Sequence, residues 1–230
     1  MTTQGPRKIG SLLLQIDMPP NLGADQLKVL QKATKDCPVL RNLNDSIKIK
    51  VKWNQLKQKK KTSLNFVATN VFRETPDVTF FDAGINGSNG SDVVIHHGAA
   101  ISPPNDEEFE QYYVHHHQID HNLVLEGSRT FTLLNPAWDE PHHVIYLNPK
   151  MGALQIPIGT FHRSISGKDG SIVINQAIRD EQFEPTTEFD PISIEKRMDL
   201  QKVKSVDPII WKLENGEIKR IKDSLFLKVA

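Results

Sequence analysis

Short apolar runs separated by turn residues dominate the chain between about residues 64 and 179. Glycine, proline and asparagine cluster between the runs, as hairpins and turns require, and no helical period intervenes. Parallel strands would need long helical crossovers, so an antiparallel β-barrel or jelly roll is predicted. The predicted strands are Asp77–Phe81, Asp92–His96, Asn122–Glu126, Arg129–Leu134, Val144–Leu147, Ala153–Ile156, His162–Ile165 and Ser171–Ile178.

The first 55 residues have a different pattern, typical of a small α+β segment. Ser11–Ile16 is a short apolar run that suits a buried strand, and apolar residues recur with helical spacing from Ala24 to Asp36. A helix there should end at Cys37-Pro38, because proline cannot continue the hydrogen-bonding pattern. Ile47–Trp53 then alternates apolar residues with lysines, as in a strand with one solvated face. So few elements bury little surface, and we expect them to dock on the main domain or on a second subunit.

These changes of pattern predict four segments. Residues 1–55 form the α+β segment, 56–63 a basic linker, 64–183 the barrel and 184–230 a C-terminal extension. The extension contains a possible short helix over Ile194–Val203 and a hairpin signal at Asn215-Gly216. We expect it to pack on the barrel or on a dimer partner, because exposed sheet edges invite unwanted pairing.

Composition excludes several classes of partner. The chain has 28 basic and 28 acidic residues, so no overall charge draws it to nucleic acid or to an anionic membrane. The single cysteine, Cys37, excludes an intramolecular disulfide, and we see neither a secretory signal nor a membrane-span pattern. These features predict a soluble, cytoplasmic protein that binds a small-molecule substrate or ligand, with no nucleic acid and no membrane partner. The two flanking segments, which need a surface to dock on, predict a homodimer.

Two clusters contain the candidate chemistry. His115 to His121 places four histidines and one carboxylate within seven residues, and a strand entered at His115 would turn His115 and His117 to one face. The second cluster, Gly152–His162, contains a strand, a Pro157–Gly159 turn and a histidine that opens the next strand. A small barrel can hold one ion and one ligand, so we expect inward histidines to bind a metal there.

The two clusters resemble the paired motifs of the cupin superfamily. His115, His117 and Gly127 match the first motif, and the run from Gly152 to His162 matches the second. The resemblance spans about 110 to 130 residues and implies a double-stranded β-helix, which is an antiparallel jelly-roll barrel. It also implies one divalent transition metal, namely iron, manganese, zinc, nickel or copper.

The chain departs from the family at the third ligand, where a glutamate is usual. Counting back from Gly127 gives Asp120, whereas counting forward from His117 gives His121. A slip of one residue exchanges the inward and outward side chains of a strand, so both residues remain candidates. The predicted metal ligands are therefore His115, His117, His162 and either Asp120 or His121.

Other side chains are expected near the pocket as substrate contacts. Arg163 is the most suggestive, because a guanidinium beside a metal ligand can bind a carboxylate, although strand alternation should point it away from His162. The predicted set is Tyr113, Phe161, Arg163, Asn175 and Gln176.

Residues 28–51 also resemble the closing portion of OsmC-type hydroperoxide reductases. The resemblance consists of an amphipathic helix, Cys37-Pro38-Val39 and a short alternating strand. Thiol chemistry in that family uses a second cysteine, which this chain lacks. We therefore interpret Cys37 as a small apolar residue at a helix end.

The leading hypothesis is a metal-dependent enzyme that acts on a small organic molecule, with dioxygenase-like chemistry, isomerisation or hydrolysis as the reaction. No catalytic residue is assigned beyond the metal ligands. The alternative is a barrel that binds or senses a small ligand without catalysis, because fold does not decide function.

Overall fold

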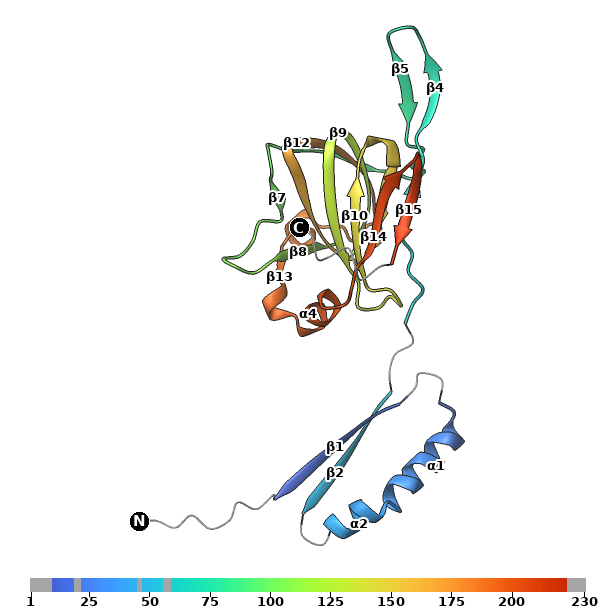
Figure 1. Cartoon of the computed structure of the whole chain (residues 1–230), viewed down its shortest axis with the longest axis vertical. Coiled ribbons are helices and arrows are strands. Elements are labelled where there is room, and N and C mark those ends of the chain that lie inside the picture. Colours follow the sequence, from blue (N-terminus) through green and yellow to red (C-terminus); the bar gives the residue numbers. More distant parts are fainter. Residues whose placement is uncertain (1–9, 19–21, 45–46, 56–58, 223–230) are drawn as a thin grey trace, which may run out of the picture. The chain divides into compact units, whose positions relative to one another are not determined.

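The structure, a computed structural model, describes residues 10–18, 22–44, 47–55 and 59–222 (Figure 1). It divides the chain into two compact units, Met1–Lys59 and Lys60–Ala230. Residues 56–58 of the predicted linker and 223–230 of the predicted extension lie outside the described residues. In the part of the chain that is described, no helix is both long enough and apolar enough to cross a membrane.

The first unit consists of two strands and two helices. Its elements are β1 (Ser11–Met18), α1 (Ala24–Lys35), α2 (Pro38–Asn44) and β2 (Lys48–Gln55). The strands β1 and β2 pair in parallel. α1 ends before Cys37, as expected, but Pro38 then begins a second helix, since proline is tolerated in a first helical turn.

Two long strands form the frame of the second unit. β9 (Gln118–Leu134) and β12 (Phe161–Arg179) pair antiparallel over nearly their whole lengths, with a register shift between Ser166 and Ser171. Each of them was predicted as two separate strands. Both continue through glycines with positive φ, Gly127 in β9 and Gly170 in β12, and the two strands pair again on the far side of the register shift.

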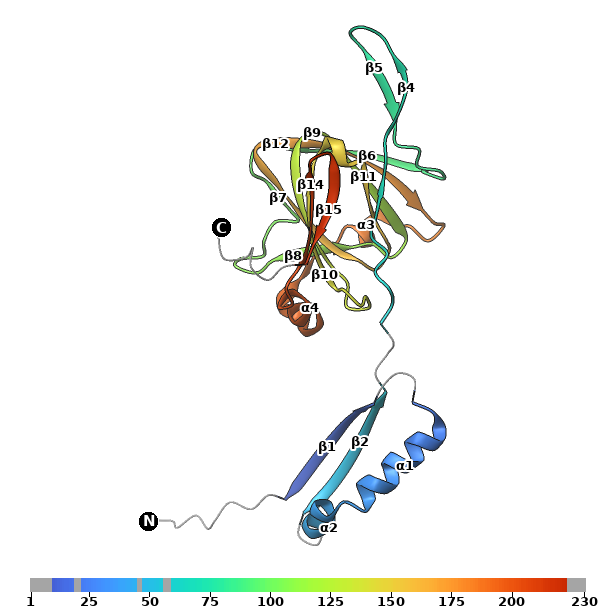
Figure 2. The same ribbon diagram turned by 45° about the vertical axis from the view of Figure 1, so that its right-hand side comes forward.

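Shorter strands extend this frame on both edges (Figures 1 and 2). β12 pairs on its other edge with β6 (Gly90–His96), β7 (Ile101–Ser102) and β8 (Gln111–Val114). β9 pairs with β10 (His142–Leu147) and β11 (Ala153–Ile156), and β11 pairs in turn with β3 (Asn65–Val67). All of these pairings are antiparallel, as the short strands and turns predicted.

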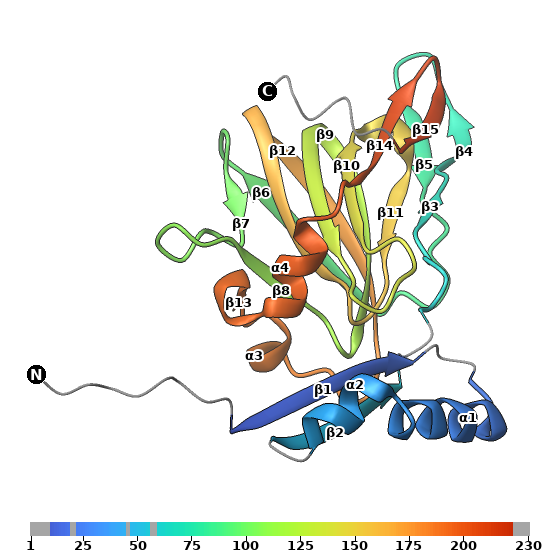
Figure 3. The same cartoon turned by 60° about the horizontal axis from the view of Figure 1, so that its bottom comes forward.

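The C-terminal segment belongs to the same unit. β14 (Ile209–Glu214) adds to β10 in parallel and forms a hairpin with β15 (Glu217–Ile221) through the expected Asn215-Gly216 turn. The parallel pairing was not predicted. Before this hairpin come α3 (Pro185–Glu188), β13 (Ile192–Ser193), the 3-10 turn η2 (Ile194–Lys196) and α4 (Met198–Lys204), which lie near β8 at one end of the barrel (Figure 3).

Two further elements complete the unit. β4 (Asn70–Glu74) and β5 (Thr79–Asp82) form a separate antiparallel hairpin, and the 3-10 turn η1 (Pro149–Met151) precedes β11.

The main apolar core joins β9, β10, β11 and β12. Leu133, Ile145 and Leu154 are fully buried in it, and each contributes about 1.5–3 kcal/mol by leaving water. Trp211 and Leu213 of the hairpin pack against the same core, which anchors the C-terminal segment. The prediction of a mainly β, largely antiparallel barrel is confirmed.

Candidate functional site

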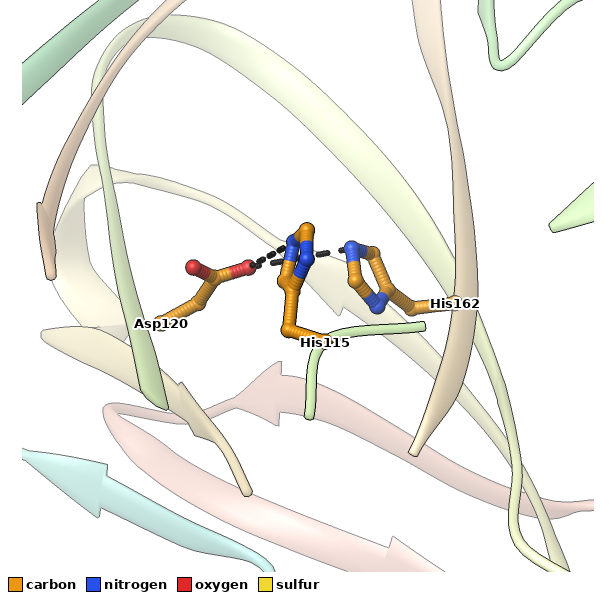
Figure 4. Close-up of side chains that lie close together, drawn as sticks. All are labelled: His115, Asp120 and His162. Atoms are coloured by element: carbon orange, nitrogen blue, oxygen red, sulfur yellow. Dashed lines mark ion pairs between the residues drawn. The ribbon is translucent and has the colours of Figure 1, made fainter. Parts of the chain in front are cut away.

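Three side chains from separate parts of the second unit meet in the barrel (Figure 4). His115, Asp120 and His162 are all buried, and each offers a nitrogen or oxygen atom within 4.8 Å of the others. They make up the one group of this kind among the described residues. We call them the His–Asp–His cluster.

Local structure explains why these three converge. His115 follows β8 in a bend, Asp120 is the third residue of β9, and His162 is the second residue of β12. The Pro157–Gly159 turn delivers His162, and the backbone N–H of Gly159 donates to the carbonyl of His115 over 2.7 Å. One backbone hydrogen bond therefore links the segments that provide the two histidines.

Asp120 is the centre of the cluster. Its Oδ1 accepts hydrogen bonds from Gln118 Nε2 at 2.6 Å and Asn175 Nδ2 at 2.9 Å. Its Oδ2 lies 3.4 Å from His115 Nε2 and 3.7 Å from His162 Nε2. Burial alone would raise the pKa of Asp120, but the contacts with His115 and the amide donor of Asn175 outweigh burial and lower that pKa. Asp120 is therefore a carboxylate.

His115 is held as an imidazolium. Its Nδ1 lies 2.9 Å from the carbonyl oxygen of Glu188, which can only accept, and its Nε2 faces the Asp120 carboxylate. Both ring nitrogens must then carry protons. Burial opposes this charge, yet the Asp120 carboxylate and the groups of Glu188 prevail and raise the pKa of His115. The ring of Phe189 packs edge-on against it at a centroid distance of 5.3 Å.

His162 is held in the neutral form. Its Nδ1 lies 3.2 Å from the carbonyl oxygen of Thr160 and so carries the ring proton, which leaves a lone pair on Nε2. Burial, and then the charge of His115, lower the pKa of His162 to about 4. The two rings lie only 4.9 Å apart between centroids, yet their environments drive their pKa values in opposite directions.

A cavity of about 320 Å³ opens beside the cluster. Most of the residues that line it are of polar type, and they come from β6, β7, β8, β9 and β12, with His115 from the segment after β8 and Phe189 from the C-terminal segment. The lining residues are Asp92, Val94, Ser102, Tyr113, His115, Gln118, Asp120, Asn122, Arg129, Phe131, His162, Ser164, Asn175 and Phe189.

His117 does not join the cluster, although it was predicted to face the same way as His115. The segment from His115 to His117 is a bend and not a strand, so the two-residue alternation does not apply there. His117 Nδ1 instead lies 3.0 Å from Asp180 Oδ2, in a partly exposed ion pair.

Of the two alternatives, Asp120 and His121, only Asp120 belongs to the His–Asp–His cluster. Both are buried, but His121 is on the opposite face of β9, where its Nδ1 donates to the carbonyl of Gln176 over 3.1 Å. Burial lowers the pKa of His121, so it is neutral in that position. Alternation within β9 places Gln118 and Asn122 on the inward face with Asp120.

The predicted substrate contacts divide into two groups. Tyr113 and Asn175 line the cavity. The other three do not: Phe161 packs in the apolar cluster near α4, Arg163 pairs with Glu110 at 3.1 Å, and Gln176 contributes its backbone carbonyl to His121. Strand alternation explains Arg163, which lies next to His162 in β12 and points the other way.

Sequence reasoning missed several cavity residues. Gln118 and Asn122 share the two-residue period of Asp120, and that period could have identified them. Arg129 lies near the Gly127 bend, where the period is interrupted. Glu188 is 73 residues from His115 and no local pattern connects the two.

Comparison with known proteins gives likeness in structure alone. No family model and no curated protein matches the chain. A 3,4-ketoisomerase from Thermoanaerobacterium thermosaccharolyticum in complex with TDP is 17% identical over 61% of this chain and 94% of its own, with a TM-score of 0.41. A dTDP-4-dehydrorhamnose 3,5-epimerase from Elizabethkingia anophelis is 13% identical over 65% of this chain and 87% of its own, with a TM-score of 0.43.

A third similar structure is a dTDP-6-deoxy-D-glucose-3,5-epimerase from Legionella pneumophila, in complex with dTDP-4-keto-L-rhamnose. It is 11% identical over 57% of this chain and 77% of its own, with a TM-score of 0.39. The OsmC-type resemblance of residues 28–51 finds no support in these comparisons.

The prediction of a divalent transition metal is corrected by the charges and the membership of the cluster. The spacing of the cluster would admit a cation, but the imidazolium of His115 already neutralises Asp120. Of the five predicted ligands, His117 and His121 also lie outside the cluster. The hypothesis of dioxygenase-like chemistry was argued from that metal, so nothing in the cluster supports it.

Proposed function

We propose that this barrel catalyses proton transfer at a carbon next to a carbonyl of a small polar molecule, as an isomerase or epimerase. One observation carries the proposal: the cavity holds two histidines whose rings lie 4.9 Å apart, and their surroundings raise the pKa of His115 and lower the pKa of His162. Two titratable groups whose pKa values are driven apart are the usual basis for separate base and acid roles.

Each residue then has a defined role. Nε2 of His162 removes the proton from the carbon, while its Nδ1–H stays bonded to Thr160. The Nε2–H of His115 exchanges its contact with Asp120 for the carbonyl oxygen on which negative charge develops, and donates a hydrogen bond or its proton to that oxygen. Asp120 orients His115 and holds it protonated, and the polar wall of Asn122 and Ser164 suits hydroxyl groups on the substrate.

The test follows carbon-bound hydrogen exchange in D₂O by proton NMR, with a panel of hydroxy-ketones, keto sugars and 2-keto acids. The wild-type chain should exchange the hydrogen next to the carbonyl of at least one compound. His162→Gln should reduce the rate by about 10²–10⁴-fold, the usual contribution of a general base.

Matched controls separate this function from its competitors. His117→Gln changes a histidine outside the cavity and should leave the rate unchanged. A chelator should also leave it unchanged, whereas loss of exchange with EDTA that added metal restores would contradict the proposal. Retained exchange in His162→Gln would do so as well. Ligand binding without exchange across the panel would indicate a non-catalytic binding module instead.

A further inference from the structure

Arg129 is a charged side chain in the same cavity that the proposed proton transfer does not use. It follows the Gly127 bend of β9, lines the cavity beside Phe131, and is only 3% exposed. Arginine is rarely buried without a partner, so its surroundings decide what it does.

The hydrogen bonds of Arg129 all go to neutral groups. Its Nε and Nη2 donate to Ser171 Oγ at 3.1 and 2.9 Å, and Nη2 also reaches the carbonyl of Val94 at 3.4 Å. Nη1 has no hydrogen-bond partner among the described residues. Part of the guanidinium fork is therefore available to another acceptor.

No negative charge of the described chain compensates Arg129. Asp92 also lines the cavity, but its carboxylate accepts from Arg179 over 2.7 Å. The neighbouring His96 brings no charge, because burial, and then the charge of Arg129, lower the pKa of His96 to about 4. Burial lowers the pKa of Arg129 itself to about 10, which still leaves it cationic at neutral pH.

A buried cation without an anion costs several kcal/mol of desolvation. Neutral hydrogen bonds to Ser171 and Val94 would not need a guanidinium, since a glutamine could donate to either of them. A negatively charged ligand would offset the desolvation cost of Arg129 and accept hydrogen bonds from its Nη1.

We propose that Arg129 binds an oxyanion, a carboxylate or a phosphate, carried by the small molecule that occupies the cavity. The inference rests on the proposed function only in taking this cavity as the substrate site. A volume of about 320 Å³ is at the small end of ligand sites, which favours a compact acid such as a keto acid or a sugar phosphate.

The experiment titrates the full chain with pyruvate, inorganic phosphate and the neutral analogue pyruvamide, using calorimetry. Pyruvate or phosphate should bind and pyruvamide should not, and the tighter of the two anions identifies the source of the charge. Arg129→Gln should raise the Kd of that anion by about tenfold or more, as expected for loss of a charge-assisted pair. Arg73→Gln, which changes an arginine of the β4–β5 hairpin, should bind like wild type.

A second measurement needs no variant. Binding of the anion to the wild-type chain should shift the NMR signal of the Arg129 Nε–H. Equal affinity in wild type and Arg129→Gln, or an unshifted Arg129 signal at saturating anion, would overturn the inference.

These results also separate the two proposals. Anion binding in a chain that exchanges no carbon-bound hydrogen would leave the Arg129 inference standing and remove the proposed function. Hydrogen exchange in neutral hydroxy-ketones without any anion binding would support the proposed function and remove the Arg129 inference.

Discussion

At the residue scale, the contrast between His115 and His162 is the central feature of this protein. Both are buried histidines of the same cavity and both lie near the Asp120 carboxylate, at 3.4 Å for His115 and 3.7 Å for His162. Only His115 also has the carbonyl and the carboxylate of Glu188 beside it, whereas Nδ1 of His162 faces the carbonyl of Thr160. Burial lowers the pKa of both rings, and the contacts with Asp120 and Glu188 outweigh burial only for His115. The site therefore separates acid and base at a centroid distance of only 4.9 Å.

This contrast predicts a pH profile. The base function of His162 should be lost as pH falls through about 4, because its Nε2 then takes up a proton. The acid function of His115 should be lost as pH rises through a pKa above the usual histidine value of 6.5. The rate of exchange, measured as kcat/KM, should therefore be flat between these limits.

Asp120→Asn should move only one limb of that profile strongly. Without the carboxylate, burial and the contacts with Glu188 remain but the largest influence that raises the pKa of His115 is gone, so that pKa falls and the alkaline limb moves to lower pH. An NMR titration of the His115 ring measures this directly, and His117→Gln should leave the titration as in wild type. An unchanged His115 pKa in Asp120→Asn would show that another group holds its proton.

At the element scale, the two long strands depend on glycine bends. Gly127 has φ +76°, and an added Cβ would lie 2.3 Å from the carbonyl oxygen of Gly170 on the paired strand. Real Cβ atoms do not approach backbone oxygen so closely, so this bend requires glycine for space as well as for conformation. A bulge just before this bend, where Leu125 is the extra residue between Val124 and Glu126, shifts the alternation of β9, so both Asp120 and Arg129 line one cavity.

Gly127→Ala should therefore destabilise the chain more than an alanine at an open turn. Gly216 has φ +79° but no atom near its Cβ position, so Gly216→Ala should cost only the backbone penalty of about 1–2 kcal/mol. Gly127→Ala should add about 1–3 kcal/mol for overpacking. Urea unfolding of the two variants measures the difference, and equal losses would contradict the steric explanation.

At the scale of the whole molecule, all the cavity residues belong to the second unit. The sheet that holds them contains strands from residues 65–221, and none from the first unit. The C-terminal hairpin and the segment with Glu188 are part of that unit. The homodimer stays a prediction.

A chain of residues 60–230 should consequently fold and keep its site. A compact unit with its own core is expected to be independent. Thermal unfolding should remain cooperative, and the His115 titration and the anion affinity should match those of the full chain. Loss of either property in a folded shortened chain would show that the first 59 residues support the cavity.

The sequence by itself determined most of the β-structure and the two ends of the site. Alternating runs and turn residues predict the strands well, because side-chain period and turn chemistry are local properties. The same patterns indicated His115 and His162, although the cation once expected between them is corrected.

The tertiary structure decided which side chains meet. It selected Asp120 over His121 through the register of β9, and it turned His117 outward because a bend ends the alternation. It also brought the Glu188 carbonyl to His115 and left Arg129 without a counter-charge. Such contacts join residues far apart in the chain, and the charge state of each group depends on all of its neighbours, so no local pattern contains them.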